Sequence, residues 1–236
     1  MTRLKQDQNL KVQSSRPLSA KECKALRAAL VVNENFFGYS LPRVNIVVCH
    51  SKGEWRRATT YYHFEFARGV VMRDGTVVVK SPLLARRSVQ QWQKIVAHEI
   101  NHAFWMRRSA RGRDLWSPIW LLEGLACFVA KNDIVMNARA MKEAVRHLQV
   151  RSLLPYRYRA ALFPDYRTVK IYYSLWCHFL RWLTRTKPSG LAHLLQRRRQ
   201  LSSKALFDRE FRRTYGDGAD ELLRKYLGKR PALTDT

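Results

Sequence analysis

The spacing of apolar residues changes once along this chain, near Ser88, and this change constrains the fold more than any other feature. Before Ser88, the clearest apolar runs are short and rich in β-branched residues, which is typical of strands. After Ser88, apolar residues recur with the period of about 3.6 residues that is typical of helices. We therefore predict an α+β fold, with a small N-terminal sheet followed by a mostly helical C-terminal part.

Two segments carry the strand prediction. The run "RVNIVVCH", residues 43–50, predicts one strand. The run "GVVMRDGTVVVK", residues 69–80, has two β-branched stretches around Asp74 and Gly75, which are residues that accept the positive φ angles of a tight turn. This second run predicts a hairpin of two strands, whereas residues 51–67 give no clear pattern.

Helix signals begin at Ser19. Ser19 is a suitable N-cap and Glu22 completes a capping box, which predicts a helix from Ala20 to about Asn33. The periodic spacing predicts further helices over residues 88–107, 118–131, 134–150, 168–185, 190–200, 203–215 and 218–226.

The organisation of the chain indicates one domain. We predict a single domain over residues 19–228, with a sheet-containing part (19–87) and a helical part (88–228), and we expect a flexible basic tail over residues 1–18 and a second tail over 229–236. The start of the chain lacks the apolar segment of a signal peptide, and no run of 18 apolar residues predicts a membrane span. The four cysteines are scattered without a CxxC pair, so we expect free, mostly buried thiols in a reducing compartment and a cytoplasmic protein.

Charge is unusual in this chain. It has 44 Lys and Arg against 18 Asp and Glu, a formal net charge of +26. Such a surface attracts phosphate polyanions, anionic membranes or acidic proteins, without choosing among them. Basic runs lie at residues 107–113, 196–200 and 210–215, and solvated helix faces and loops explain them equally well.

The apolar run "IVAHEINHAFW", residues 95–105, contains two histidines four residues apart. On a helix His98 and His102 share one face, so both imidazoles can bind a single ion. Glu99 falls near the same side, where its carboxylate can hold a water molecule. An HExxH pattern arises by accident in roughly one such chain per hundred, with the histidines acting only as polar helix residues, so a third ligand is needed to support a metal site.

The run "SPIWLLEGLACFVA", residues 117–130, supplies that ligand. Glu123 is its only charged residue. Ser117 is a good N-cap and Pro118 a good first-turn residue for a largely buried helix. A buried carboxylate without a partner costs several kcal/mol, so it takes up a proton, pairs with a cation such as arginine, or binds a metal. The histidine pair upstream favours the metal.

At these two segments the chain resembles the gluzincin arrangement of zinc metallopeptidases, specifically the peptidase MA-like group. In that group, an HExxH motif is followed by a Trp-Leu-x-Glu-Gly-Leu-Ala-x-aromatic segment, here "WLLEGLACF". The likeness covers roughly residues 40–228 and is diffuse outside the two segments. The resemblance implies a zincin-like fold in which His98, His102 and Glu123 bind Zn²⁺ and Glu99 is the general base.

The resemblance extends to a tyrosine-led helix that begins "YYSLWCHFLRWL". Tyr173 matches the family tyrosine, although a one-residue slip would exchange it with Tyr172. Its hydroxyl could stabilise an oxyanion, and a packed aromatic ring is the alternative. In the thermolysin-like branch an aspartate one turn after the glutamate ligand orients a histidine. Here that position is Cys127, which leaves Asp114 and Asp133 as candidates for the orienting role.

The sequence thus predicts a zinc metallopeptidase that acts on peptides or proteins. An extended substrate could pair with the edge strand of the hairpin at residues 69–80, although a plain core role explains that hairpin equally. The alternative is a basic, nucleic-acid-associated protein that keeps the zincin scaffold as a binding module, with hydrolysis vestigial or directed to proteins on DNA. The intact Glu99 argues against a vestigial site, because a binding module has no need for a general base.

Overall fold

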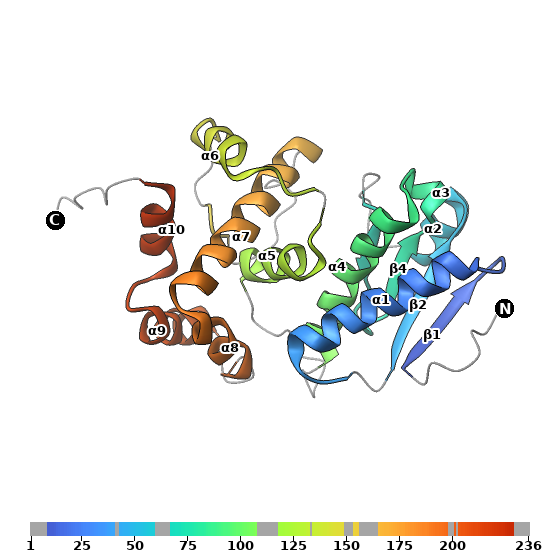
Figure 1. The fold of residues 1–236 in the computed structure, drawn as a ribbon, viewed down its shortest axis with the longest axis horizontal. Helices are drawn as coiled ribbons and strands as arrows, with labels where there is room; N and C mark the ends of the chain where they lie inside the picture. The colour runs from blue at the N-terminus through green and yellow to red at the C-terminus, as the bar shows by residue number, and fades with distance from the viewer. Residues whose placement is uncertain are drawn as a thin grey trace. The chain divides into compact units, whose positions relative to one another are not determined.

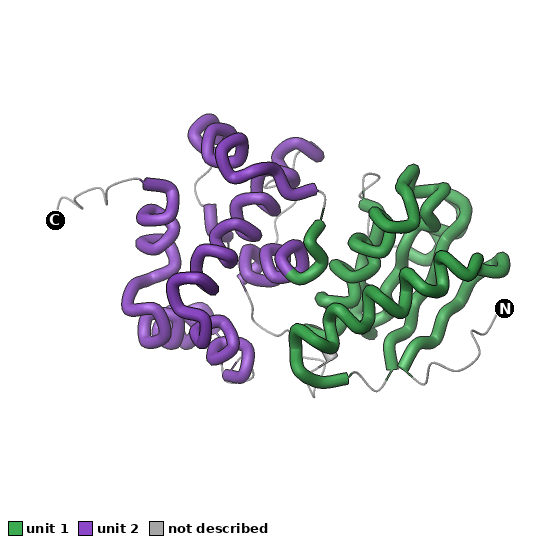
Figure 2. The backbone as a smooth tube through the Cα atoms, in the orientation of Figure 1, with its two compact units in different colours: residues 1–110, 129–133 green, residues 111–128, 134–236 purple. Residues whose placement is uncertain are grey.

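The structure is a computed structural model, and it describes residues 9–40, 43–59, 67–107, 118–132, 134–148, 153–155, 165–197, 201 and 203–228. The chain is mixed α+β, as predicted, with a small sheet near its N-terminus and helices after it (Figure 1). It divides into two compact units (Figure 2), unit 1 with residues 1–110 and 129–133 and unit 2 with residues 111–128 and 134–236. Residues 95–105, which contain His98 and His102, belong to the same unit as the sheet.

Unit 1 contains a four-stranded sheet with the order β1-β2-β4-β3. Its strands are β1 (Leu10–Ser14), β2 (Val44–Cys49), β3 (Gly69–Val71) and β4 (Val77–Lys80). Strands β1, β2 and β4 are parallel, and β3 runs antiparallel to β4. The predicted strand in residues 43–50 is therefore confirmed.

The prediction of a flexible tail over residues 1–18 is wrong for β1. Leu10 and Val12 are buried in the core, and Val12 pairs with Ile46 of β2. A five-residue strand with two buried apolar side chains gives little periodic signal by itself, and the backbone pairing that stabilises it comes from β2. Residues 1–8 and the predicted C-terminal tail, 229–236, lie outside the described residues.

The predicted hairpin is confirmed. Gly75 has a φ of 80°, as the turn requires. The Asp74 carboxylate accepts hydrogen bonds from the backbone N–H of Thr76 at 2.9 Å and from its hydroxyl at 2.8 Å. The turn sequence therefore fixes the pairing of β3 with β4.

Helices α1 (Ala20–Phe37) and α4 (Val89–Arg107) pack their apolar side chains into one core with one face of this sheet. The predicted capping box of Ser19 and Glu22 begins α1, which ends at Gly38, where φ is 69°. Helix α1 thus runs past the predicted end at Asn33. Ser88 caps α4, because its Oγ accepts a hydrogen bond from the backbone N–H of Gln91 at 3.2 Å.

Two short helices of unit 1 fall where we predicted none. Helix α2 (Lys52–Ala58) places Trp55 against Cys49 and Val78 on the other face of the sheet. Helix α3 (Pro82–Ala85) connects β4 to α4. The indole N–H of Trp92 donates to the carbonyl of Lys80 at 2.8 Å, which ties the start of α4 to the end of β4.

Unit 2 is helical. Its elements are α5 (Ile119–Ala130), whose last two residues belong to unit 1, α6 (Ala138–Arg146), α7 (Tyr166–Thr186), α8 (Pro188–Arg197), α9 (Lys204–Tyr215) and α10 (Ala219–Leu227). Trp120 of α5 lies 5.8 to 6.1 Å, between ring centroids, from Phe179, Phe207 and Phe211. These aromatic contacts join α5, α7 and α9 in the core of unit 2.

Helix α6 is shorter than the predicted helix over residues 134–150. The backbone N–H of Met136 donates to Ser174 Oγ at 2.8 Å, and the Met136 carbonyl lies 2.8 Å from His178 Nε2. These contacts with α7 hold Met136 outside a helix, and Asn137 caps α6 after it.

Two further expectations concern the chain as a whole. All four cysteines are free, and Cys49, Cys127 and Cys177 are buried, as predicted. No helix within the described residues has the length and apolar character needed to cross a membrane.

Candidate metal centre

Helix α4 places His98 and His102 on one face, one turn apart. Their Nε2 atoms lie 3.2 Å apart and their rings meet at 86°. Two nitrogens that each lie about 2.05 Å from a tetrahedral zinc ion are about 3.3 Å apart. The pair therefore has the separation of two ligands to one ion, which is also a distance at which one imidazole can donate a hydrogen bond to the other.

Glu123 of α5 completes a three-residue cluster. The ligand atoms of His98, His102 and Glu123 all lie within 4.8 Å of one another. Glu123 is partly exposed on a mostly buried helix. In the first turn of this helix, the Pro118 carbonyl accepts a hydrogen bond from the backbone N–H of Leu121 at 3.0 Å. Two imidazoles and a carboxylate are a common ligand set of catalytic zinc sites, so the chemistry of the donors fits such an ion.

Glu99 is 8% exposed and its side chain faces strand β3. A Cβ atom added to Gly69 would lie 2.5 Å from Glu99 Cγ and 2.8 Å from Glu99 Oε1, which is closer than real Cβ atoms approach. A side chain at position 69 would therefore require the Glu99 carboxylate to move. We did not predict this role for Gly69, although a glycine in a strand often marks a close approach of another group.

The two candidate tyrosines differ in exposure. Tyr172 is fully buried, and its ring lies 5.1 Å from that of Trp176. Burial raises the pKa of the Tyr172 hydroxyl. Tyr173 is partly exposed, with its ring 5.8 Å from Trp176. Of the two, Tyr173 is the one whose side chain solvent can reach.

The predicted partners that would orient the histidines stay untested. Cys127 is fully buried one turn after Glu123. Asp114, Asp133, the N-cap candidate Ser117 and most of the basic run at residues 107–113 lie outside the described residues.

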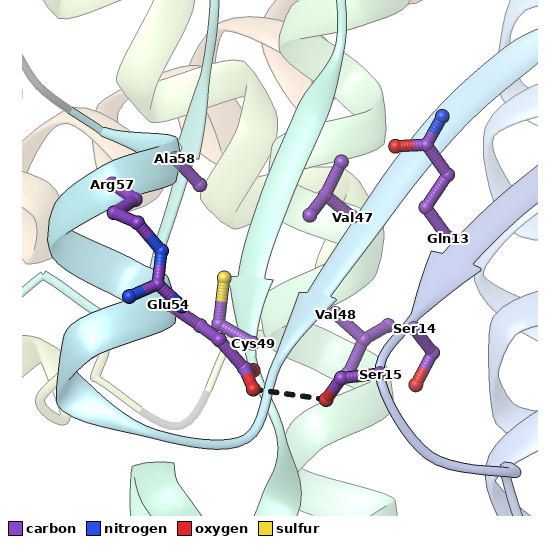
Figure 3. A pocket seen from close by; sticks show the side chains of 9 residues that line it. All are labelled: Gln13, Ser14, Ser15, Val47, Val48, Cys49, Glu54, Arg57 and Ala58. Carbon is purple, nitrogen blue, oxygen red and sulfur yellow. Dashed lines mark hydrogen bonds between the residues drawn. The ribbon is translucent and has the colours of Figure 1, made fainter. Parts of the chain in front are cut away.

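A separate cavity of about 350 Å³ lies in unit 1 beside α2 and the ends of β1 and β2 (Figure 3). Glu54 holds these ends together, because its carboxylate accepts hydrogen bonds from Ser15 Oγ at 2.9 Å and from the backbone N–H of His50 at 2.6 Å. Val47 and Cys49 line it from the sheet face opposite α4. The cavity is therefore distinct from the histidine cluster.

Comparisons of this chain with protein-family models, with curated proteins and with solved structures found no match. The gluzincin resemblance therefore stays a prediction that rests on two short segments.

Proposed function

We propose that this protein is a zinc-dependent metallopeptidase. The observation that carries the proposal is the cluster of His98, His102 and Glu123, whose ligand atoms lie within 4.8 Å of one another. The buried carboxylate of Glu99 follows His98 directly on the same helix. A metal-binding cluster beside a buried carboxylate is what metal-assisted hydrolysis requires.

The roles of the residues follow from their chemistry. His98, His102 and Glu123 would hold the ion, which when bound supplies a Lewis acid and a water with a pKa of about 7. Glu99 accepts a proton from the attacking water and delivers it to the leaving amine. The hydroxyl of Tyr173 would donate a hydrogen bond to the oxyanion that forms on the substrate carbonyl.

A zincin-like fold belongs to the same proposal. Helix α4 shares a core with the sheet, and the carboxylate of Glu99 meets the edge strand β3 at Gly69. Within the described residues, β3 pairs with β4 on one side only. An extended peptide added along the other side of β3 would lie beside Glu99.

Metal analysis combined with cleavage of a broad peptide library tests the proposal. We expect about one zinc per chain in the purified protein. Both His98→Ala and His102→Ala should lose the zinc and all cleavage. His147→Ala, which removes an exposed histidine of unit 2, should change neither. Full zinc content in both variants at positions 98 and 102 under mild chelation would refute the ligand assignment, and zinc without cleavage of any peptide would refute the peptidase.

A further inference from the structure

A buried pair of asparagines links α1 to α4 inside unit 1. Asn33 of α1 is 0% exposed and Asn101 of α4 is 1% exposed. Asn101 Nδ2 donates to Asn33 Oδ1 at 2.9 Å, and Asn33 Nδ2 donates to the carbonyl oxygens of Ala29 at 3.0 Å and Ala97 at 2.9 Å. The amide of Asn33 thus uses both of its N–H groups and its oxygen.

A buried network of this kind favours the arrangement of the two helices in which its hydrogen bonds form. Around this pair, α1 and α4 contribute apolar side chains to one core, including Leu26, Leu30, Val96 and Ile100. Such apolar surfaces pack in more than one rotation and register at similar energy, whereas a buried amide that loses its partners is destabilised. Buried polar groups are best documented in this role of fixing a helix register.

The two α4 residues that bond to Asn33 lie next to the candidate ligands. Ala97 and Asn101 directly precede His98 and His102 on α4. The rotation of α4 that turns Ala97 and Asn101 toward Asn33 therefore also sets the direction in which His98 and His102 point. A side-chain tip lies about 6 Å from a helix axis, so a rotation of about 10° moves it by about 1 Å. Metal–ligand distances tolerate only about 0.2 Å.

Glu99 depends on the same rotation. Its carboxylate already fills the space that a Cβ at Gly69 would take, with 2.8 Å between that position and Oε1. A turn of α4 about its axis would press Glu99 into β3 or withdraw it.

We propose that Asn33 and Asn101 are positioning residues for the metal centre, because their amide pair fixes the rotation of α4. The inference rests on the proposed function. It adds Asn33, which lies 65 residues before His98 in the sequence, to the parts of the chain on which metal binding depends.

The test is the double variant Asn33→Leu/Asn101→Leu. It removes both side-chain amides together. A single substitution would instead leave the remaining amide buried without its partner. We expect the metal-free double variant to melt at or above the temperature of the wild type. Its dissociation constant for zinc should nevertheless rise about tenfold or more, and kcat should fall more than KM changes. The visible spectrum of the cobalt-loaded variant should differ from that of the wild type, since it reports coordination geometry.

Thr59→Val is the matched control. Thr59 is 3% exposed, and its hydroxyl donates a hydrogen bond to the Trp55 carbonyl at 2.7 Å, so this variant also removes a buried polar group. It should leave the affinity for zinc unchanged. If the double variant fails to fold, Asn101→Ala replaces it, because Asn33 then keeps its bond to Ala97. Its zinc affinity should fall below that of Thr59→Val.

A folded double variant with wild-type zinc affinity and cobalt spectrum would overturn this inference and leave the proposed function standing. Asn101→Ala with the zinc affinity of Thr59→Val would overturn it as well. A wild-type chain that binds no zinc or cobalt would overturn both this inference and the proposed function.

Discussion

Glu99 and Glu22 are the buried acidic side chains among the described residues, and they differ in what surrounds them. Glu22 accepts hydrogen bonds from the backbone N–H and the hydroxyl of Ser19, both at 2.8 Å, so it stabilises the start of α1. Glu99 instead lies against Gly69 and next to a candidate ligand.

Replacing Glu99 by Gln should show whether Glu99 acts as the general base and not as a metal ligand. We expect Glu99→Gln to keep its zinc and its melting temperature, because the amide has the same shape and can hydrogen-bond to water. Cleavage should fall by about 10²-fold or more, because an amide cannot accept the proton. Zinc content, thermal unfolding and peptide turnover measure the three quantities. Turnover at the wild-type rate would remove Glu99 from the mechanism.

The cysteines should differ in reactivity. Burial raises the pKa of Cys49 and of Cys177 to about 11, so at pH 8 about one thiol in a thousand is the reactive thiolate. Cys127 is fully buried, and Cys23 is partly exposed. In the folded protein, an alkylating reagent should modify Cys23 first, and denaturant should expose the other three to it. Mass spectrometry after timed labelling measures the order, and equal rates at Cys23 and Cys49 would contradict it.

At the scale of elements, the contact between β3 and α4 depends on a missing side chain. We expect Gly69→Ala to displace the Glu99 carboxylate and to reduce turnover about tenfold or more while the zinc content stays the same. Gly53→Ala is a matched control, because its Cβ would approach no atom closer than 3.6 Å. Peptide turnover and metal content of the two variants test this prediction. A fully active Gly69→Ala would contradict it and would show that Glu99 tolerates movement.

Helices α5 and α7 also meet at a glycine. A Cβ at Gly124 would lie 2.9 Å from Trp176 Cβ and 3.0 Å from the backbone carbon of Trp176, neither of which can rotate away. Gly124→Ala should therefore lower the free energy of unfolding by about 1–3 kcal/mol, despite the better helix propensity of alanine. Denaturant unfolding measures this loss. A stability equal to or above that of the wild type would mean that α5 and α7 separate without cost.

For the whole molecule, the net charge of +26 predicts binding to polyanions. We expect the chain to bind random duplex and single-stranded nucleic acid at low salt, with an affinity that falls steeply as salt rises, because bound phosphates release counterions. If that binding is part of the function, polynucleotide should alter peptide cleavage. A salt titration of binding beside a cleavage assay with and without polymer measures both. Weak binding at low salt would refute the polyanion prediction, and tight binding with unchanged cleavage would separate the charge from catalysis.

Local signals in the sequence predicted the elements that local interactions define. The capping box at Ser19, the turn at Gly75 and the apolar spacing of α4 each act within a few residues, so they can be seen without the rest of the fold. Strand β1 is different, because its stability comes from pairing with β2, which begins 30 residues after β1 ends. The late start of α6, within the helix predicted over residues 134–150, is different too, since Ser174 and His178 of α7 hold Met136 outside the helix.

The same distinction applies to the site. By itself the sequence determined the two histidines on one helical face and the neighbouring glutamate, because the period of an α-helix fixes residues four apart. Only the tertiary structure decided that Gly69 leaves space for Glu99 and that Asn33 holds α4 through Ala97 and Asn101. These contacts join residues 30 to 68 positions apart, and no rule of local spacing specifies such pairs because the packing of whole helices and strands creates them.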